Sequence, residues 1–267
     1  MSADPTPILA ALAAELGSPP KLAPGDLATL ASAASDAPQL RRWLKRRLAG
    51  EPVAHITGRF LFRGREFLVD KRAYVTDPEL THLVDAVLAA ARSFAATHGR
   101  APLIAEIGVG CASLAITLKH ALPDARVVGL DLDPDALAVA ARNVERHGLA
   151  ITLIESDLFA SWPADLPPPD LIYGDPPWGD EGMLYAEDRP AGHYHAMPPA
   201  SAFPLGGSTG VHRQILQEIT RRGWPSEVWL NGGVIPHQAL TTLGALTPAH
   251  TVLSPVAGIS LLRCGPA

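Results

Sequence analysis

The chain has 267 residues, 47% of them hydrophobic, and a formal net charge of −5. That is enough apolar sequence for one large domain or two small ones, and the acidic balance argues against a broad nucleic-acid surface. Cys111 and Cys264 lie far apart without metal-ligand spacing, and the apolar runs are too short or too interrupted to span a membrane. No signal peptide is evident, so we expect a cytoplasmic protein with free thiols and no bound metal.

The first 70 residues predict a small helical domain. Apolar side chains recur at helical spacing over residues 8–16, 27–30 and 40–48. Residues 58–75 then predict a short hairpin with an aromatic-rich apolar face, which links this domain to the rest of the chain. The hairpin linker ends at about residue 75, so residues 76–267 are expected to form the second, catalytic domain.

Strands and helices alternate after residue 76. The predicted strands are 103–107, 127–130, 151–154, 171–173 and 228–230, and the predicted helices are 83–91, 113–121, 135–147, 210–221 and 236–246. This order predicts an α/β fold with a mostly parallel, doubly wound sheet, as in Rossmann-like proteins. The tail over residues 250–263 predicts a hairpin that closes one edge of the sheet in the antiparallel sense.

A glycine-containing loop follows the first strand of that sheet. Gly108 and Gly110 let the backbone approach a ligand at the point where doubly wound sheets bind cofactors. A dinucleotide site would need a third glycine and a helix N-terminus for a pyrophosphate. Glu106 begins the loop instead, and its carboxylate suits a cationic amino group better than a pyrophosphate.

Two further carboxylates follow the next strands. Asp131 ends the second strand, where it can accept hydrogen bonds from both hydroxyls of a ribose, and Asp157 follows the third, where it can accept from an adenine amine. A ligand with an ammonium group, a ribose and an adenine is S-adenosyl-L-methionine (SAM). The order of these residues therefore favours SAM over a nicotinamide cofactor, although each aspartate alone could be a helix N-cap.

The segment Asp175-Pro176-Pro177-Trp178 follows an apolar strand. A carboxylate, a proline carbonyl and an aromatic ring at a strand end form a stiff pocket, which can hold an N–H group under a planar or cationic partner. The segment therefore indicates chemistry at nitrogen next to the cofactor. Trp178 or Tyr74 can cover the SAM sulfonium.

These segments together resemble the HemK-type glutamine amide methyltransferases, which modify peptide-release factors. The resemblance runs from about residue 41 to residue 264, and rests on the segments 47–58 (RLAGEPVAHITG), 106–110 (EIGVG), 156–159 (SDLF) and 205–210 (LGGSTG). It implies a class I SAM-dependent methyltransferase fold with a helical N-terminal domain.

The chain departs from that family at its reactive segment. The family has Asn-Pro-Pro-Tyr where this chain has Asp175 and Trp178, and Ala112 replaces the third loop glycine. An asparagine amide can satisfy both the N–H and the C=O of a glutamine amide, whereas an ionised aspartate only accepts. A small amine or amino acid is therefore the favoured nucleophile. Residues 179–197 form an unusual segment, either a mobile surface loop or a lid over the active site.

Two alternatives remain open at this point. Some HemK-like azetidine-2-carboxylate synthases resemble this chain in departing from the parent motif, and they close the SAM α-amine onto its own γ-carbon, releasing methylthioadenosine. In that case SAM itself is the substrate. The other alternative is a non-catalytic subunit of the same fold. The sequence favours methyl transfer to a small molecule, with neither nucleic acid nor membrane as partner, and leaves the oligomeric state open.

Overall fold

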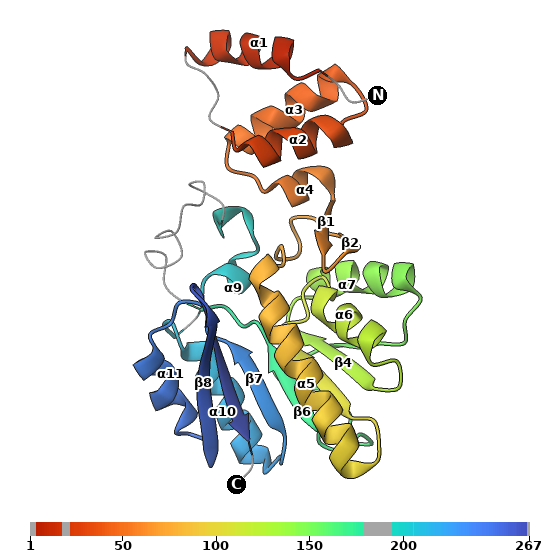
Figure 1. The fold of residues 1–267 in the computed structure, drawn as a ribbon, viewed down its shortest axis with the longest axis vertical. Coiled ribbons are helices and arrows are strands. Elements are labelled where there is room, and N and C mark those ends of the chain that lie inside the picture. The colour runs from red at the N-terminus through yellow and green to blue at the C-terminus, as the bar shows by residue number, and fades with distance from the viewer. Residues whose placement is uncertain (1–3, 18–21, 179–193, 205, 266–267) are drawn as a thin grey trace.

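The computed structural model describes residues 4–17, 22–178, 194–204 and 206–265. A group of N-terminal helices stands apart from a large sheet, with a short helix and a hairpin between the two (Figure 1). The elements of this first part are α1 (Thr6–Leu16), α2 (Pro24–Ala33), α3 (Ala37–Leu48), α4 (Val53–Thr57), β1 (Arg59–Phe62) and β2 (Arg65–Leu68).

The N-terminal helices pack around a small apolar core of their own. Leu12, Leu30, Leu40 and Leu44 are almost completely buried in it. The Asp36 side chain accepts a hydrogen bond from the backbone N–H of Gln39 at 2.6 Å, which caps the first turn of α3. The spacing of these leucines is the periodicity that predicts helices in the sequence.

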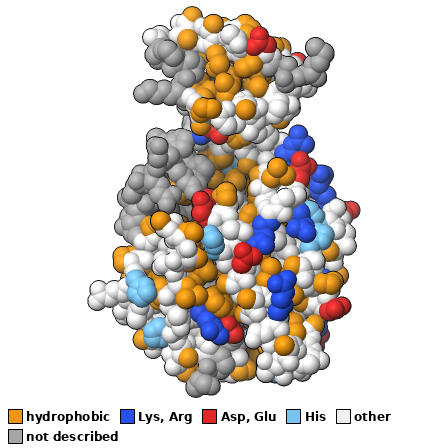
Figure 2. Space-filling view, in the orientation of Figure 1, with side chains coloured by type: hydrophobic (Ala, Val, Ile, Leu, Met, Phe, Trp, Pro, Cys, Tyr) orange, Lys and Arg blue, Asp and Glu red, His pale blue; other side chains and the backbone are white. Residues whose placement is uncertain are grey.

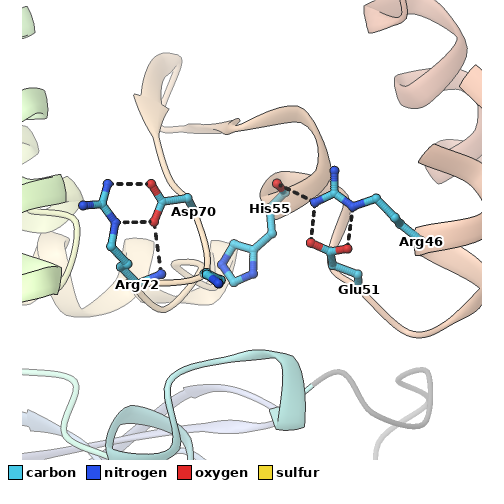
Figure 3. Close-up of a pocket in the computed structure, with 6 residues that line it drawn as sticks. Arg46, Glu51, His55, Asp70 and Arg72 are labelled. Carbon is cyan, nitrogen blue, oxygen red and sulfur yellow. Dashed lines mark hydrogen bonds and ion pairs between the residues drawn. The ribbon is translucent and has the colours of Figure 1, made fainter. Parts of the chain in front are cut away.

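Charged pairs lie on both sides of the hairpin in the sequence. Arg46 forms a two-point ion pair with Glu51, and Arg72 forms another with Asp70. His55 lies between these pairs, its Nε2 3.0 Å from the carbonyl of Ala73, beside a cavity of about 350 Å³ (Figure 3). Burial lowers the pKa of His55 and so favours the neutral ring. None of the site residues predicted from the sequence lines this cavity.

Within the described residues, seven strands form one sheet in the order β5-β4-β3-β6-β7-β9-β8. The strands are β3 (Leu103–Ile107), β4 (Arg126–Asp131), β5 (Thr152–Glu155), β6 (Leu171–Gly174), β7 (Glu227–Asn231), β8 (Ala249–Val256) and β9 (Ile259–Gly265). Neighbours from β5 to β7 are parallel, and β9 and β8 add in the antiparallel sense. The order reverses between β3 and β6, which is the switch point where such sheets bind ligands.

Helices cover both faces of the sheet. They are α5 (Thr81–His98), α6 (Ser113–Ala121), α7 (Pro134–His147), α10 (Gly210–Arg222) and α11 (His237–Gly244), with short turns η1 (Pro78–Leu80), η2 (Tyr194–Ala196) and α9 (Pro199–Ala202). One core joins α5, α6 and α7 to one face, and a second joins α10 and α11 to the other. Alternate residues of β6 show the division, because Tyr173 faces the first core and Ile172 the second.

The predicted α/β fold class is confirmed, including the antiparallel hairpin at the sheet edge. The short helix α4 is an addition to the predicted elements. The boundary near residue 75 remains a proposal. Residues 179–193 lie outside the described residues, and with them most of the segment predicted as a surface loop or lid, including Tyr185 and His193. On the face drawn in Figure 2, basic and acidic side chains are interspersed.

Candidate cofactor and catalytic site

Four parallel strands end side by side, and their carboxyl ends form one end of the sheet. The loop of residues 108–112 follows β3 there, Asp131 ends β4, Asp175 follows β6 and Asn231 ends β7. Parallel pairing alone brings these positions together, although they are spread over more than a hundred residues. Three of the four are positions that the sequence predicts for the site.

The loop after β3 is tied to β4 by backbone hydrogen bonds. The N–H groups of Gly108 and Val109 both donate to the carbonyl of Leu130, at 2.8 and 3.0 Å. Gly108 and Gly110 adopt φ angles of 69° and 53°, a region that favours glycine. A Cβ on either glycine would meet no protein atom within 4 Å, so both face open space that a ligand can use.

Asp131 shapes the same loop from the neighbouring strand. Its Oδ2 accepts from the N–H of Gly110 at 2.8 Å, and its Oδ1 accepts from the N–H of Asp133 at 3.0 Å. Each carboxylate oxygen has a second lone pair that can still accept from a ribose hydroxyl. Burial raises the pKa of Asp131, while these backbone donors oppose the rise.

Glu106 lies beneath the loop and is almost fully buried. It is 2% exposed, and the hydroxyl of Tyr173, its partner across β3 and β6, donates to its Oε2 at 2.5 Å. Burial raises the pKa of Glu106 to about 8, and the nearby Asp131 and Asp175 add to the rise. Without a ligand the carboxyl is therefore mostly protonated at pH 7, and a cation beside it would favour the ionised form.

Asp175 is held in place by Asn231. The Asn231 amide Nδ2 donates to Asp175 Oδ1 at 2.6 Å, while the Asn231 Oδ1 accepts from the N–H of Gly233 at 3.0 Å. The second bond fixes which way the amide points, so Asp175 keeps a donor on one oxygen and leaves Oδ2 for another partner. Burial raises the pKa of Asp175 to about 7, and the negative charge of Asp77 contributes.

Trp178 packs against the backbone of Gly233. A Cβ on Gly233 would lie 2.1 Å from the indole, so only glycine leaves room for the ring there. A cavity of about 70 Å³ lies next to Trp178 and is also lined by Asp77, Tyr194 and Asn231, among others. Asn231 is thus a wall of this cavity and the partner of Asp175.

The other residues predicted for the site, Pro176, Tyr74 and Asp157, differ in how far they are buried. Pro176 is buried directly after Asp175. Tyr74 is partly buried, and its hydroxyl donates to Asp77 Oδ2 at 3.4 Å. Asp157 is exposed beyond β5, with its backbone carbonyl accepting from the N–H of Ala160. Its side chain is therefore free to meet solvent or an adenine at the edge of the site.

Comparison with known proteins agrees with this geometry. A family model described as a methyltransferase domain matches residues 104–174, which span β3 to β6. The release factor glutamine methyltransferase of Chlorobaculum tepidum is 35% identical over 138 residues, which cover 50% of this chain and 47% of that protein. The 4-amino-L-phenylalanine/4-methylamino-L-phenylalanine methyltransferase of Streptomyces pristinaespiralis is 30% identical over 163 residues, 61% of this chain and 55% of that protein.

The region from β3 to β6 thus matches a methyltransferase domain, and the chain is similar to proteins named as methyltransferases. Its matches span about half of the length of these two relatives. The solved structure of the T. thermophilus 16S rRNA methyltransferase RsmC, in complex with AdoMet and guanosine, has a TM-score of 0.55 and 18% identity, and the match covers 78% of this chain and 50% of that one. This likeness supports the fold.

Sequence reasoning missed two residues of this candidate site. Asn231 stands in a Leu-Asn-Gly-Gly run that is typical of a strand end and turn, so nothing nearby in the sequence marks it. Asp77 lies between the predicted hairpin and the first helix of the second domain, in a segment with no motif that marks it. Asn231 becomes visible through the strand order, which sets β7 beside β6, and Asp77 through its charge beside Asp175.

The described part of the chain has no helix long and apolar enough to cross a membrane. Among the same residues, no three His, Cys, Asp or Glu side chains gather as metal ligands would. Cys111 and Cys264 are both buried free thiols.

Proposed function

We propose that the protein transfers the methyl group of SAM to the nitrogen of a small amine or amino acid. The observation that carries the proposal is the oriented carboxyl of Asp175, with Asn231 on one oxygen and a pKa near 7. Such a group can accept a hydrogen bond from an amine and take its proton close to neutral pH. An amine nitrogen must lose a proton before it can attack, because the ammonium form has no lone pair.

The acidic surroundings support an amine rather than an amide. Asp77 adds its negative charge to the field at Asp175, and Glu106 and Asp131 lie on the cofactor side. An amide oxygen would need a donor here, whereas an ionised Asp175 offers only acceptors. The relative from Streptomyces pristinaespiralis is named for amines carried by an amino acid, which supports the same class of acceptor.

The site residues have distinct proposed roles. Glu106 pairs with the ammonium of SAM, and Asp131 accepts from the ribose hydroxyls on the neighbouring strand. Asp157 accepts from the adenine amine at the outer edge. Trp178 or Tyr74 covers the sulfonium, which a cation–π contact stabilises by about 0.5–2 kcal/mol.

The step itself is a direct displacement. The nitrogen lone pair forms a bond to the methyl carbon as the bond from that carbon to sulfur breaks, leaving S-adenosylhomocysteine. The nitrogen proton passes to Asp175 and then to solvent, and the Pro176 carbonyl is a second acceptor that orients the nitrogen. Orientation of the two reactants is the main contribution of the protein in this scheme.

The narrow space at Trp178 favours cyclisation of SAM as the alternative reaction. The indole fills the volume over Gly233, and the cavity beside it measures about 70 Å³. A site with little room for a second molecule suits cyclisation of SAM. There the α-amine would attack the γ-carbon, the bond from that carbon to sulfur would break, and azetidine-2-carboxylate and methylthioadenosine would form.

Product analysis distinguishes the two reactions. The protein is incubated with SAM alone and with SAM plus a panel of small amines and amino acids, and the nucleoside products are separated by liquid chromatography and mass spectrometry. S-adenosylhomocysteine that forms only with an added amine supports methyl transfer. Methylthioadenosine formed from SAM alone, above the rate without protein, would establish cyclisation instead.

Variants of Asp175 test the observation behind the proposal. Asp175→Ala should retain SAM binding and lower kcat by roughly 10²–10⁴-fold, the usual contribution of an acid–base group. Asp175→Asn should recover part of the activity if the main role of Asp175 is to orient the amine. It should recover little if the main role is to remove the proton. Asp165→Ala, at an exposed aspartate remote from the site, is the matched control. Full activity in the Asp175→Ala protein would exclude Asp175 from the mechanism.

A further inference from the structure

A completely buried histidine, His212, lies behind the candidate site. It stands in the first turn of α10 and is 0% exposed. Its Nε2 is 2.7 Å from the backbone carbonyl oxygen of Asn231, the last residue of β7. A carbonyl oxygen only accepts, so Nε2 carries the ring proton and donates it. His212 therefore connects α10 to the strand end that holds the partner of Asp175.

The other ring nitrogen of His212 has no hydrogen-bond partner within the described part of the chain. This Nδ1 is buried, and with the proton on Nε2 it carries a lone pair that could accept a hydrogen bond. A buried acceptor left unpaired lowers the stability of the folded protein. An apolar side chain of similar size would avoid that loss. The hydrogen bond to Asn231 is what distinguishes histidine from such a residue at this position.

His212 is a neutral group in this environment. Burial lowers the pKa of its ring, and the hydrogen bond to the Asn231 carbonyl opposes the fall. The ring is therefore uncharged at pH 7 and adds no charge to the field at Asp175. Its influence on the site passes through the position of Asn231.

Three hydrogen bonds fix Asn231, and through it Asp175. His212 donates to the backbone carbonyl of Asn231, and the N–H of Gly233 donates to its side-chain Oδ1 at 3.0 Å. The Asn231 Nδ2 then donates to Asp175 Oδ1 at 2.6 Å. The next turn of α10 is anchored as well, because Ile215 is 0% exposed in the core on this face of the sheet. His212 thus holds the strand end from a helix that is itself packed in place.

We propose that His212 is a positioning residue for the reaction at Asp175. It holds the end of β7 so that the Asn231 amide stays on one carboxylate oxygen of Asp175 and leaves the other oxygen for the amine. The inference rests on the proposed N-methylation. His212 itself touches neither the amine nor SAM in this scheme, since it is completely buried, and it exchanges no proton during the reaction.

Two substitutions of His212 test this role. His212→Met removes the donor and keeps a side chain of similar size, whereas the amide nitrogen of His212→Gln can replace Nε2. We expect His212→Met to lower kcat roughly 2–10-fold, the worth of one hydrogen bond, and to leave SAM affinity unchanged. His212→Gln should restore part of the rate. An unchanged kcat in a folded His212→Met protein would overturn the inference.

The pH–rate profile gives a readout that a purely structural role would not move. A looser Asn231 lowers the pKa of Asp175 less, so the acidic limb of the kcat profile should move to higher pH in His212→Met. The other charges that act on Asp175 come from Asp77, before η1, and Glu106, on β3, and neither is changed by the substitution. His212→Gln should return the limb toward that of wild type.

His55 offers a matched control in the N-terminal part of the chain. It is 6% exposed, its Nε2 lies 3.0 Å from the carbonyl oxygen of Ala73, and its buried Nδ1 also has no partner among the described residues. His55→Met therefore removes the same kind of hydrogen bond away from Asp175. Urea unfolding measures the stability of both variants, and only His212→Met should move the acidic limb. An equal movement in His55→Met would mean that lost stability is the cause, and the inference would fail.

Nitrogen NMR of the unaltered protein tests the donor without any substitution. At pH 7 the His212 ring should be neutral, with its proton on Nε2. A proton on Nδ1 instead, or a charged ring, would overturn the inference even if His212→Met does not fold.

Carbon NMR separates this inference from the proposed function. The Asp175 carboxyl signal, assigned by its loss in Asp175→Asn, gives the pKa of Asp175 without turnover. A higher pKa in His212→Met, with no methylated product from wild type and any amine, would support the positioning role and contradict N-methylation. Methylated product with the same kcat and pH profile in wild type and His212→Met would support N-methylation and contradict the positioning role.

Discussion

The side chain of Asn231 fixes the position of the Asp175 carboxyl and lowers its pKa. The Asn231 donor favours the ionised carboxyl, while burial and the charge of Asp77 favour the protonated form. The balance leaves the pKa of Asp175 at about 7, in the range where a proton acceptor works efficiently. In the proposed reaction Asn231 is therefore a positioning residue that acts through Asp175.

Replacing Asn231 by Leu should move the pH dependence of turnover. Asp175 must be ionised to accept a proton, so the rate rises as pH passes its pKa. Loss of the donor removes an interaction that lowers the pKa, so the acidic limb of the kcat profile should move to higher pH. The measurement is the pH–rate profile with SAM saturating. Asn231→Gln should restore part of the shift, and an unchanged limb in Asn231→Leu would contradict the coupling.

The elements of the sheet follow closely from the sequence. The alternation of strands and helices predicts the parallel core, and the apolar tail predicts the antiparallel hairpin at one edge. The order in which β9 lies between β7 and β8 needs long-range pairing that no local pattern encodes. Asn231 was missed for the same reason, since its role depends on β7 lying beside β6. Helix α4 was missed because five residues are too few for a periodic signal.

Gly174 allows the neighbouring strands β3 and β6 to pack closely next to the site. Gly174 ends β6, and a Cβ there would lie 2.6 Å from the carbonyl oxygen of Ile107 on β3. Gly174→Ala should therefore destabilise the protein by roughly 1–3 kcal/mol, because backbone atoms must move. Urea unfolding measures the change. Gly25→Ala, where a Cβ meets nothing within 4 Å, is the control and should be neutral or slightly stabilising.

At the scale of the whole molecule, the buried carboxyls of the site make the folded protein less stable as pH rises. The folded pKa values of Glu106 and Asp175 are raised to about 8 and about 7, against ordinary values of 4.5 and 3.8. Between the ordinary and the raised values the folded protein binds more protons than the unfolded chain. The free energy of unfolding therefore falls as pH rises through this window, and the stability due to protonation is lost once pH exceeds the folded pKa.

We expect the protein without SAM to be less stable at pH 8 than at pH 5.5, measured by urea unfolding. Glu106→Gln, which cannot ionise, should reduce this difference. Saturating SAM should reduce it as well, because its ammonium group and sulfonium favour the ionised carboxyls. A Glu106→Gln protein with the full pH dependence of wild type would show that Glu106 is not the source.

The cofactor loop also contains a thiol, Cys111, between Gly110 and Ala112. SAM is an alkylating agent, and a thiolate is the strongest nucleophile that a side chain can offer it. Cys111 is 2% exposed, its sulfur lies 3.7 Å from the Thr76 hydroxyl, and burial raises the pKa of its thiol. The same packing that shapes the loop thus favours the protonated thiol, which reacts poorly with an alkylating agent bound next to it.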